Sequence, residues 1–274
     1  MKQPLLCNNL LPPDAPDSID IYQLTHGILP SCHIYMEAQI FAPDSKHFIL
    51  HESATPHGSD KHDPKHRYLI CDLADHSSLR PITHELGATA PSISPNGQWL
   101  YYFIDATITG GGSLSLKRVH LDGTQRETIF VLDTPLPDTH YRPSCIYPLS
   151  TIRSDGKKIA LSAFLGDGQM DPNWGLMVFD LDNPAVDLIL QGPSWCNAHP
   201  QYCRSTDPTH KTDILVQENH GNQVDANGAL LKLVGGKGAD IHVFRDDGTH
   251  RRDLPWGRDN NEFCQGHQCW RGKT

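Results

Sequence analysis

The chain has 274 residues, of which 38% are hydrophobic, and its formal net charge at neutral pH is −9. This length allows a substantial core in one or two domains. The negative charge argues against a nucleic-acid partner, which would require a basic surface. No stretch approaches the roughly 18 apolar residues of a membrane-spanning helix, and the first residues lack the continuous apolar segment of a signal peptide. We therefore expect a cytoplasmic protein that has no membrane partner.

The chain is rich in histidine, with seventeen such residues, and it contains eight cysteines. The cysteines show no tight framework, so we expect mostly buried, reduced thiols. Proline, serine, aspartate and lysine separate five of the histidines without a ligand-like spacing, which favours a solvated loop over a metal site. These five are His47, His51, His57, His62 and His66.

In chain order, residues 1–16 are predicted to form an N-terminal extension and residues 17–274 a single domain. The segment "IDIYQLTHG" at 19–27 is interpreted as an outer strand of a preceding unit. A polar turn followed by an apolar strand then recurs in "FAPDSKHFIL", "ISPNGQWLYY", "IRSDGKKIAL" and "CRSTDPTHKTDILV". Such a pattern is typical of a hairpin between two strands. The aligned turn residues are Asp44, Asn96, Asp155 and Asp207, which lie 52, 59 and 52 positions apart.

Two further strands follow each of these hairpins, and a second turn joins them. The third strand ends in aspartate near glycine or asparagine, as in "LMVFDLDNP", and a fourth apolar strand such as "VDLILQG" comes next. Four-stranded units that recur about every 50 residues predict an all-β chain folded as a β-propeller. A β-sandwich also has many short strands, but it has no reason to repeat its sequence.

The count of units predicts about four complete blades, with a partial blade at each end. The last residues, "GHQCWRGKT", fall where the innermost strand of a further blade is expected. Because closed propellers have four to eight blades and must bury their faces, we expect an incomplete segment of a larger ring.

The loop that leads into the first strand of each blade should lie at the mouth of the central channel. Residues about 50 positions apart therefore converge there, and four of five such loops contain a histidine at or near the mouth. The residues with polar or aromatic side chains at these positions are His33, Tyr35, His140, Tyr141, Arg142, His199, Tyr202, Arg204, His267 and Gln268. We interpret this convergence as a candidate site.

The segments "HIYMEAQIFAPDSKHFIL" at 33–50, "NAHPQYCRSTDPTHKTDILVQENHG" at 197–221 and "GHQCWRG" at 266–272 resemble the oligogalacturonate lyases. Members of that family are seven-bladed propellers that cleave pectin fragments by β-elimination. In that family a histidine is the base, and three histidines and a glutamine hold a divalent cation. The order and spacing of the segments agree over most of residues 17–274.

The resemblance implies roles for particular residues. His199, at the position of the family's Gly-His-Pro histidine, is implied as the catalytic base, and Arg204 as a charge-stabilising arginine. His267 and Gln268 match the His-Glu-Phe-Trp segment, with glutamine in place of glutamate, and are implied as metal ligands. The remaining ligands would fall beyond Thr274. The implied substrate-binding residues are Tyr202, Glu218, His220 and Arg142.

The resemblance implies an oligogalacturonide or related uronic-acid oligosaccharide as substrate and a divalent cation, manganese, as cofactor. Two alternatives stay open. The chain could be a non-catalytic propeller that binds a protein or sugar at its mouth, like the periplasmic translocation propellers. It could also be the propeller of a peptidase, which would need a hydrolase domain.

Overall fold

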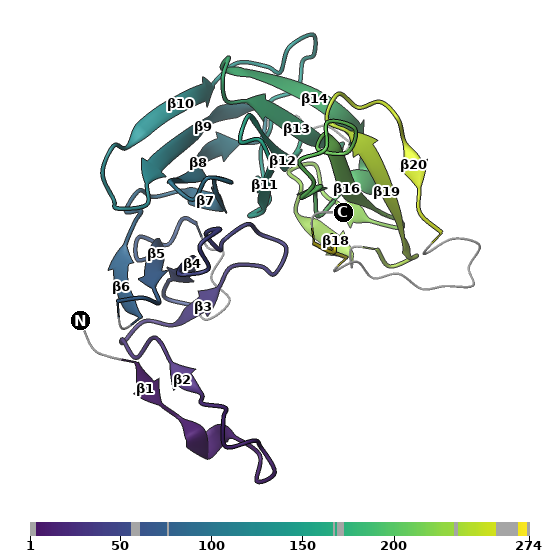
Figure 1. Cartoon of the computed structure of the whole chain (residues 1–274). Coiled ribbons are helices and arrows are strands. Elements are labelled where there is room, and N and C mark those ends of the chain that lie inside the picture. The colour runs from purple at the N-terminus through teal and green to yellow at the C-terminus, as the bar shows by residue number, and fades with distance from the viewer. Residues whose placement is uncertain are drawn as a thin grey trace.

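The computed structural model describes residues 4–55, 61–75, 77–166, 168, 173–232, 235–255 and 268–272. Of the twenty strands in these residues, sixteen belong to four four-stranded antiparallel sheets, and there are two short 3-10 helices, η1 (Asn8–Leu10) and η2 (Pro193–Trp195). The four sheets follow one another around an arc, each with its first strand on the concave side (Figure 1). The predicted β-propeller architecture with four complete blades is confirmed. Among the described residues, the blades form an open arc rather than a closed ring.

Each blade uses its strands in chain order from the inside outward. Blade 1 contains β3 (Ser31–His33), β4 (His47–Glu52), β5 (Arg67–Asp72) and β6 (Ser78–Pro81). Blade 2 contains β7 (Ala88–Ile93), β8 (Trp99–Ile108), β9 (Gly111–His120) and β10 (Glu127–Leu132). Blade 3 contains β11 (Ser150–Ile152), β12 (Lys158–Phe164), β13 (Trp174–Asp180) and β14 (Ala185–Gly192). Blade 4 contains β15 (Gln201–Tyr202), β16 (Asp213–Asn219), β19 (Ala239–Arg245) and β20 (Arg252–Asp253).

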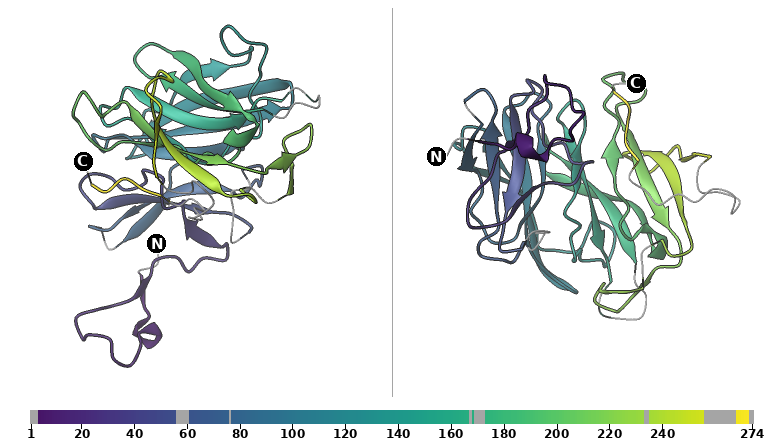
Figure 2. Two further views of the ribbon diagram at one scale, coloured as in Figure 1. Left: turned by 90° about the vertical axis from the view of Figure 1, so that its right-hand side faces the viewer. Right: turned by 90° about the horizontal axis from the view of Figure 1, so that it is seen from below.

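Two small hairpins stand outside the blades. The strands β17 (Gln223–Val224) and β18 (Leu230–Lys232) form an insertion between β16 and β19. Near the N-terminus, β1 (Leu5–Leu6) pairs with β2 (Tyr22–Gln23), and this hairpin projects away from blade 1 (Figure 2). The segment 19–27 therefore contains a strand, as predicted, but it pairs with β1 and not with a preceding blade.

The core lies between the blades because strand side chains alternate between the two faces of a sheet. In β8, Leu100 and Tyr102 pack toward blade 1, whereas Tyr101 and Phe103 pack toward blade 3. A third cluster, which includes Phe164, joins blade 3 to blade 4. This alternation explains why the second and third strands of each blade read as nearly continuous apolar runs.

The first strand of blade 1 is interrupted by an extruded loop. His33 pairs with Leu50, and the next residue back along β4, Ile49, donates its N–H to the carbonyl of Ile40. Residues 34–39 therefore leave the sheet between two consecutive ladder partners. They cross toward blades 3 and 4, where Gln39 and Glu37 make contacts. We call residues 34–39 the crossing loop.

The polar histidine-rich stretch is not a solvated loop throughout, which corrects the sequence interpretation. It contains β4, and the side chains of His51 and His66 are buried, with ring centroids 5.8 Å apart. His57 lies outside the described residues. The sequence of this stretch looks polar because it contains histidines, but some of these histidines are buried against neighbouring side chains, so the strand was not recognised. All seven described cysteines are free, and three of them are buried.

Candidate active site

The predicted base, His199, pairs with a carboxylate that the sequence did not point to. His199 lies two residues before β15 in blade 4, and Glu37 lies in the crossing loop of blade 1. The distance from His199 Nδ1 to Glu37 Oε2 is 2.6 Å, and the two residues are only 3% and 5% exposed. A hydrogen-bonded carboxylate fixes the orientation of an imidazole and stabilises its charged form.

Two tyrosine rings flank the imidazole. The ring centroid of Tyr35, from the crossing loop, lies 5.5 Å from that of His199, and the ring centroid of Tyr147, from the loop before β11, lies 5.7 Å away. Burial raises the pKa of Tyr35, and the charge of Glu37 raises it further. Burial likewise raises the pKa of Tyr147. Both hydroxyls are therefore protonated at neutral pH. The site thus draws on blades 1, 3 and 4.

The backbone of His199 is strained. Its φ is +45°, in the left-handed region that residues other than glycine rarely adopt, and Asn197 has a φ of +56°. Because Pro200 follows, His199 would ordinarily be confined to extended conformations. Such outliers persist where the surrounding structure fixes them, and they cluster at functional sites.

The pairing selects a useful tautomer. A carboxylate accepts hydrogen bonds, so the contact with Glu37 assigns the proton to Nδ1 of His199 and the lone pair to Nε2. An imidazole in that form can accept a proton through Nε2, and its positive charge is then offset by Glu37. This geometry suits general-base chemistry.

The structure separates Arg204 from His199. Arg204 follows β15 whereas His199 precedes it, and five residues of fully extended chain would span at most roughly 16 Å. Gln39, from the crossing loop of blade 1, bridges to the inner strands of blades 2 and 3. Its Nε2 donates to the carbonyl of Ile152 at 2.7 Å, its Oε1 accepts from the N–H of Ile152 at 2.5 Å, and its own carbonyl accepts from the N–H of Ile93. Arg204 lies in a cavity on the turn side of this bridge.

Tyr202 does not reach the imidazole either. Its side chain is fully buried between blades 3 and 4, and its hydroxyl donates to Asp246 Oδ2 at 3.1 Å. The same carboxylate pairs with Arg153 at 2.8 Å. These contacts make Tyr202 a packing residue, which does not fit the predicted contact with substrate.

Glu218 and His220 also have partners within blade 4. Glu218 accepts hydrogen bonds from Ser194 Oγ at 2.7 Å and from His242 Nε2 at 2.9 Å. The bond from His242, together with the nearby charge of Arg251, lowers the pKa of Glu218 to about 2. His220 contacts Asp240 at 3.1 Å. The structure thus places both predicted substrate-binding residues in hydrogen-bond networks within blade 4.

Arg142 is partly buried before blade 3 and donates through Nη1 to the carbonyl of Asp133 at 2.7 Å. This bond holds its guanidinium against the end of blade 2. No described contact joins Arg142 to His199 or Glu37.

The segment containing Gln268 lies along the inner strand of blade 4, as expected for the start of a further inner strand. The carbonyl of Gln268 accepts from Gln201 Nε2 at 2.5 Å, and Trp270 Nε1 donates to the carbonyl of Gln201 at 2.9 Å. The side-chain amide of Gln268 is buried without a hydrogen-bond partner in the described structure. The other predicted metal ligand, His267, lies outside the described residues.

The described residues do not supply a metal site. Over the described ranges, no three histidine, cysteine, aspartate or glutamate side chains are grouped closely enough to hold an ion. The orphaned amide of Gln268 is a single weak donor, which does not make a cation site by itself. The described residues therefore do not fit a metal.

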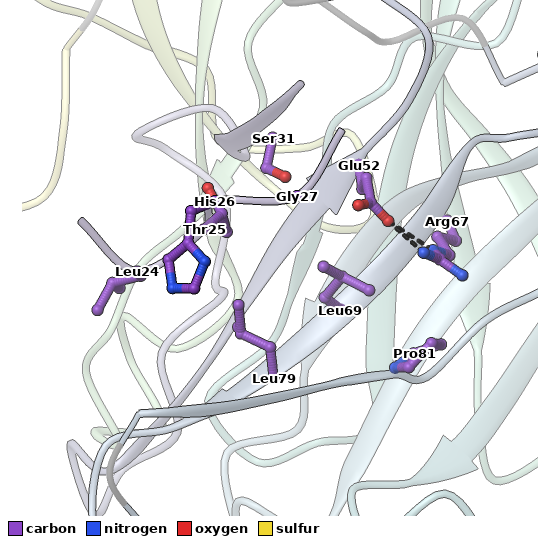
Figure 3. Close-up of a pocket in the computed structure, with 10 residues that line it drawn as sticks. All are labelled: Leu24, Thr25, His26, Gly27, Ser31, Glu52, Arg67, Leu69, Leu79 and Pro81. Carbon is purple, nitrogen blue, oxygen red and sulfur yellow. Dashed lines mark hydrogen bonds and ion pairs between the residues drawn. The ribbon is translucent and has the colours of Figure 1, made fainter. Parts of the chain in front are cut away.

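A separate hollow lies on the outer face of blade 1. It has a volume of about 270 Å³. Leu69 and Leu79 form its apolar floor, His26 projects over them, and the ion pair of Arg67 with Glu52 borders it (Figure 3). None of the predicted site residues lines this hollow. Its apolar floor belongs to a small satellite cluster on the end face of the arc.

Blade 1 should carry a pH dependence of stability through His51. Burial lowers the pKa of His51 from 6.5 to about 4, and the charges of His66 and His33 add to this effect. Between these pH values the unfolded chain binds a proton that the folded chain does not, so the free energy of unfolding falls as the pH is lowered from 6.5 to 4.

Denaturant unfolding at pH 7, 6 and 5 checks this dependence. We expect His51→Gln to remove a slope of at most about 1.4 kcal/mol per pH unit. The exposed His84 provides the control, because His84→Gln should leave the wild-type slope in place. An unchanged slope in His51→Gln would contradict the assignment.

Comparisons with known proteins support the fold. No protein-family model and no curated protein sequence matches the chain. Among solved structures, an oligogalacturonate lyase in complex with manganese is similar, with a TM-score of 0.59 and 18% identity over 85% of this chain and 56% of that one. An oligogalacturonate lyase from Vibrio parahaemolyticus gives a TM-score of 0.58 and 15% identity, covering 87% of this chain and 57% of that one.

The chain therefore spans less than two thirds of the length of these lyases, and the likeness at this identity concerns the fold. The fold resembles that of the oligogalacturonate lyases, as the sequence segments predicted. In the part of the chain that the structure describes, no helix has the length and apolar character needed to cross a membrane.

Proposed function

We propose that the chain is an oligogalacturonate lyase-like enzyme that acts on uronic-acid oligosaccharides in the cytoplasm. The observation that carries this proposal is the buried pair of His199 and Glu37, held in a strained backbone conformation between blades 1, 3 and 4. The likeness of the fold to lyase propellers supports the choice of substrate class.

The proposed reaction is a β-elimination. The C5 proton of a uronate lies α to a carboxylate, and Nε2 of His199 takes it while Glu37 offsets the charge of the resulting imidazolium. The electron pair of the C5–H bond forms the C4–C5 double bond, and the C4–O bond to the next sugar breaks. The leaving oxygen takes a proton, which a protonated tyrosine hydroxyl such as that of Tyr35 or Tyr147 could supply.

The resemblance implies a divalent cation as cofactor, with manganese as the first choice. The described residues do not fit one, so no step above depends on it. When bound, a cation of this kind would neutralise the substrate carboxylate and reduce its repulsion by the net charge of −9.

One observation favours a non-catalytic alternative. The side chain of His199 is only 4% exposed, and a base must come within hydrogen-bond reach of the proton that it takes. If the pair of His199 and Glu37 only fastens the crossing loop to blade 4, the propeller is a module that binds a sugar or protein at its mouth.

The test is a turnover assay of the purified chain with short oligogalacturonides, with added manganese and with a chelator. We expect the ultraviolet absorbance of an unsaturated uronide to rise and neutral oligosaccharides of equal length to give no signal. If calorimetry detects binding but no product forms under any condition, the non-catalytic alternative is favoured. If the assay shows no product and calorimetry shows no binding, both proposals are excluded.

A further inference from the structure

A cavity at the turn end of the channel contains a cationic side chain, Arg204, that makes no hydrogen bond or ion pair with the described residues. It has a volume of about 430 Å³ and lies where the turns after the first strands of all four blades meet. We call it the turn-end cavity. Its described lining residues are Ala38, Gln39, Ile40, Phe41, Pro43, Ile93, Ser94, Pro95, Ser154, Arg204 and Thr206.

Arg204 is the one charged residue among these lining residues. It is partly buried, and burial lowers its pKa to about 10, so it is still charged at neutral pH. Arg204 makes no hydrogen bond or ion pair with the described residues. The neighbouring Arg153, in contrast, forms ion pairs with both Asp155 and Asp246. A guanidinium removed from water without an anion is costly to fold, so such residues are ordinarily paired.

The rest of the lining indicates what would pair with it. Ile40, Phe41, Ile93 and the two prolines make most of the wall apolar. The hydroxyl of Ser154 already donates a hydrogen bond to the carbonyl of Ser205, at 2.5 Å. A strongly hydrated inorganic anion would lose its water on entering the cavity, and the cavity offers few hydrogen-bond donors to replace that water. An anion on an apolar body would instead pair with the guanidinium fork and bury its body against the wall.

We propose that the turn-end cavity is a binding site for a small organic carboxylate, which Arg204 holds through a bidentate ion pair. Ala38 and Gln39 of the crossing loop line the cavity, but neither His199 nor Glu37 does, so the site does not depend on the lyase proposal. The four blades that meet there make it a place where a ligand would contact every repeat of the arc.

Isothermal titration calorimetry with benzoate at neutral pH and low ionic strength tests the proposal. We expect saturable binding at one site, weakened at least tenfold in Arg204→Gln, and no binding of the neutral analogue benzamide. Arg142→Gln is the matched control, because that arginine lies outside the cavity, and it should bind benzoate like the wild type. His199→Ala should also bind benzoate normally, whatever its effect on turnover.

A second variant guards against a folding defect in Arg204→Gln. Thr206 is exposed and lines the cavity, so Thr206→Trp should fill the space, weaken benzoate binding and leave thermal unfolding unchanged. Equal binding of benzoate in wild type and Arg204→Gln, equal binding of benzamide, or binding of inorganic phosphate but not benzoate would each overturn the proposal.

Discussion

Replacing His199 by alanine is expected to lower the rate of uronide elimination by roughly 10²- to 10⁴-fold, the usual contribution of a positioned general base. The imidazole would be lost, while Glu37 and the two tyrosines would stay in place. The rise of product absorbance under saturating substrate measures the effect. The exposed His140, also predicted at the mouth, provides the control, and His140→Ala should keep wild-type turnover.

A glycine variant separates a catalytic from a structural role. Because His199 has a φ of +45°, His199→Gly relieves backbone strain while it removes the same ring. We expect its melting temperature to match or exceed that of His199→Ala, with turnover equally low. Turnover that survives in either variant would remove His199 from the base role. A collapse of stability in both would assign the pair with Glu37 to fastening the crossing loop.

The second large effect concerns the core between blades 2 and 3. Phe103 is fully buried, and its ring centroid lies 5.2 Å from that of Phe179 across the blade interface. Phe103→Ala should lower the free energy of unfolding by about 3–5 kcal/mol, because it removes apolar contacts and leaves a cavity. Ile108, on the same strand, is 67% exposed, so Ile108→Ala should change stability by less than about 0.5 kcal/mol.

Denaturant unfolding of both variants measures these changes. A loss below about 1 kcal/mol in Phe103→Ala would show that the two blades do not depend on this interface. A fall in the unfolding slope as well as in the midpoint would show that the blades unfold separately, in which case one free energy no longer describes the chain.

The blades could be predicted because each repeats the same turn at nearly the same spacing, and because period-two alternation assigns each strand residue to a face. The turns at Asp44, Asn96 and Asp155 all join the first strand of a blade to its second. The register of β8, which sends Leu100 and Phe103 to opposite interfaces, follows from the same alternation.

The site was less predictable, for physical reasons that differ between residues. Glu37 was missed because the crossing loop breaks the repeat, and nothing in "HIYMEAQIF" shows that six residues leave the ladder. Arg204 was assigned as a charge-stabilising arginine through the resemblance, yet β15 lies between it and His199 in the chain. Glu218 was implied as a substrate-binding residue by the resemblance, but its carboxylate accepts a hydrogen bond from His242 within its own blade.

The crossing loop also has a consequence for the order of assembly. Glu37 and His199 are 162 positions apart in the sequence, and Gln39 and Ile152, which are joined by hydrogen bonds, are 113 positions apart. Contacts of such long sequence separation close late, because the entropy of closing the chain must be overcome before they form. During synthesis, the first blade therefore waits for the inner strands of the third and fourth before its loop can dock, and the His199 pair is among the last features of the molecule to form.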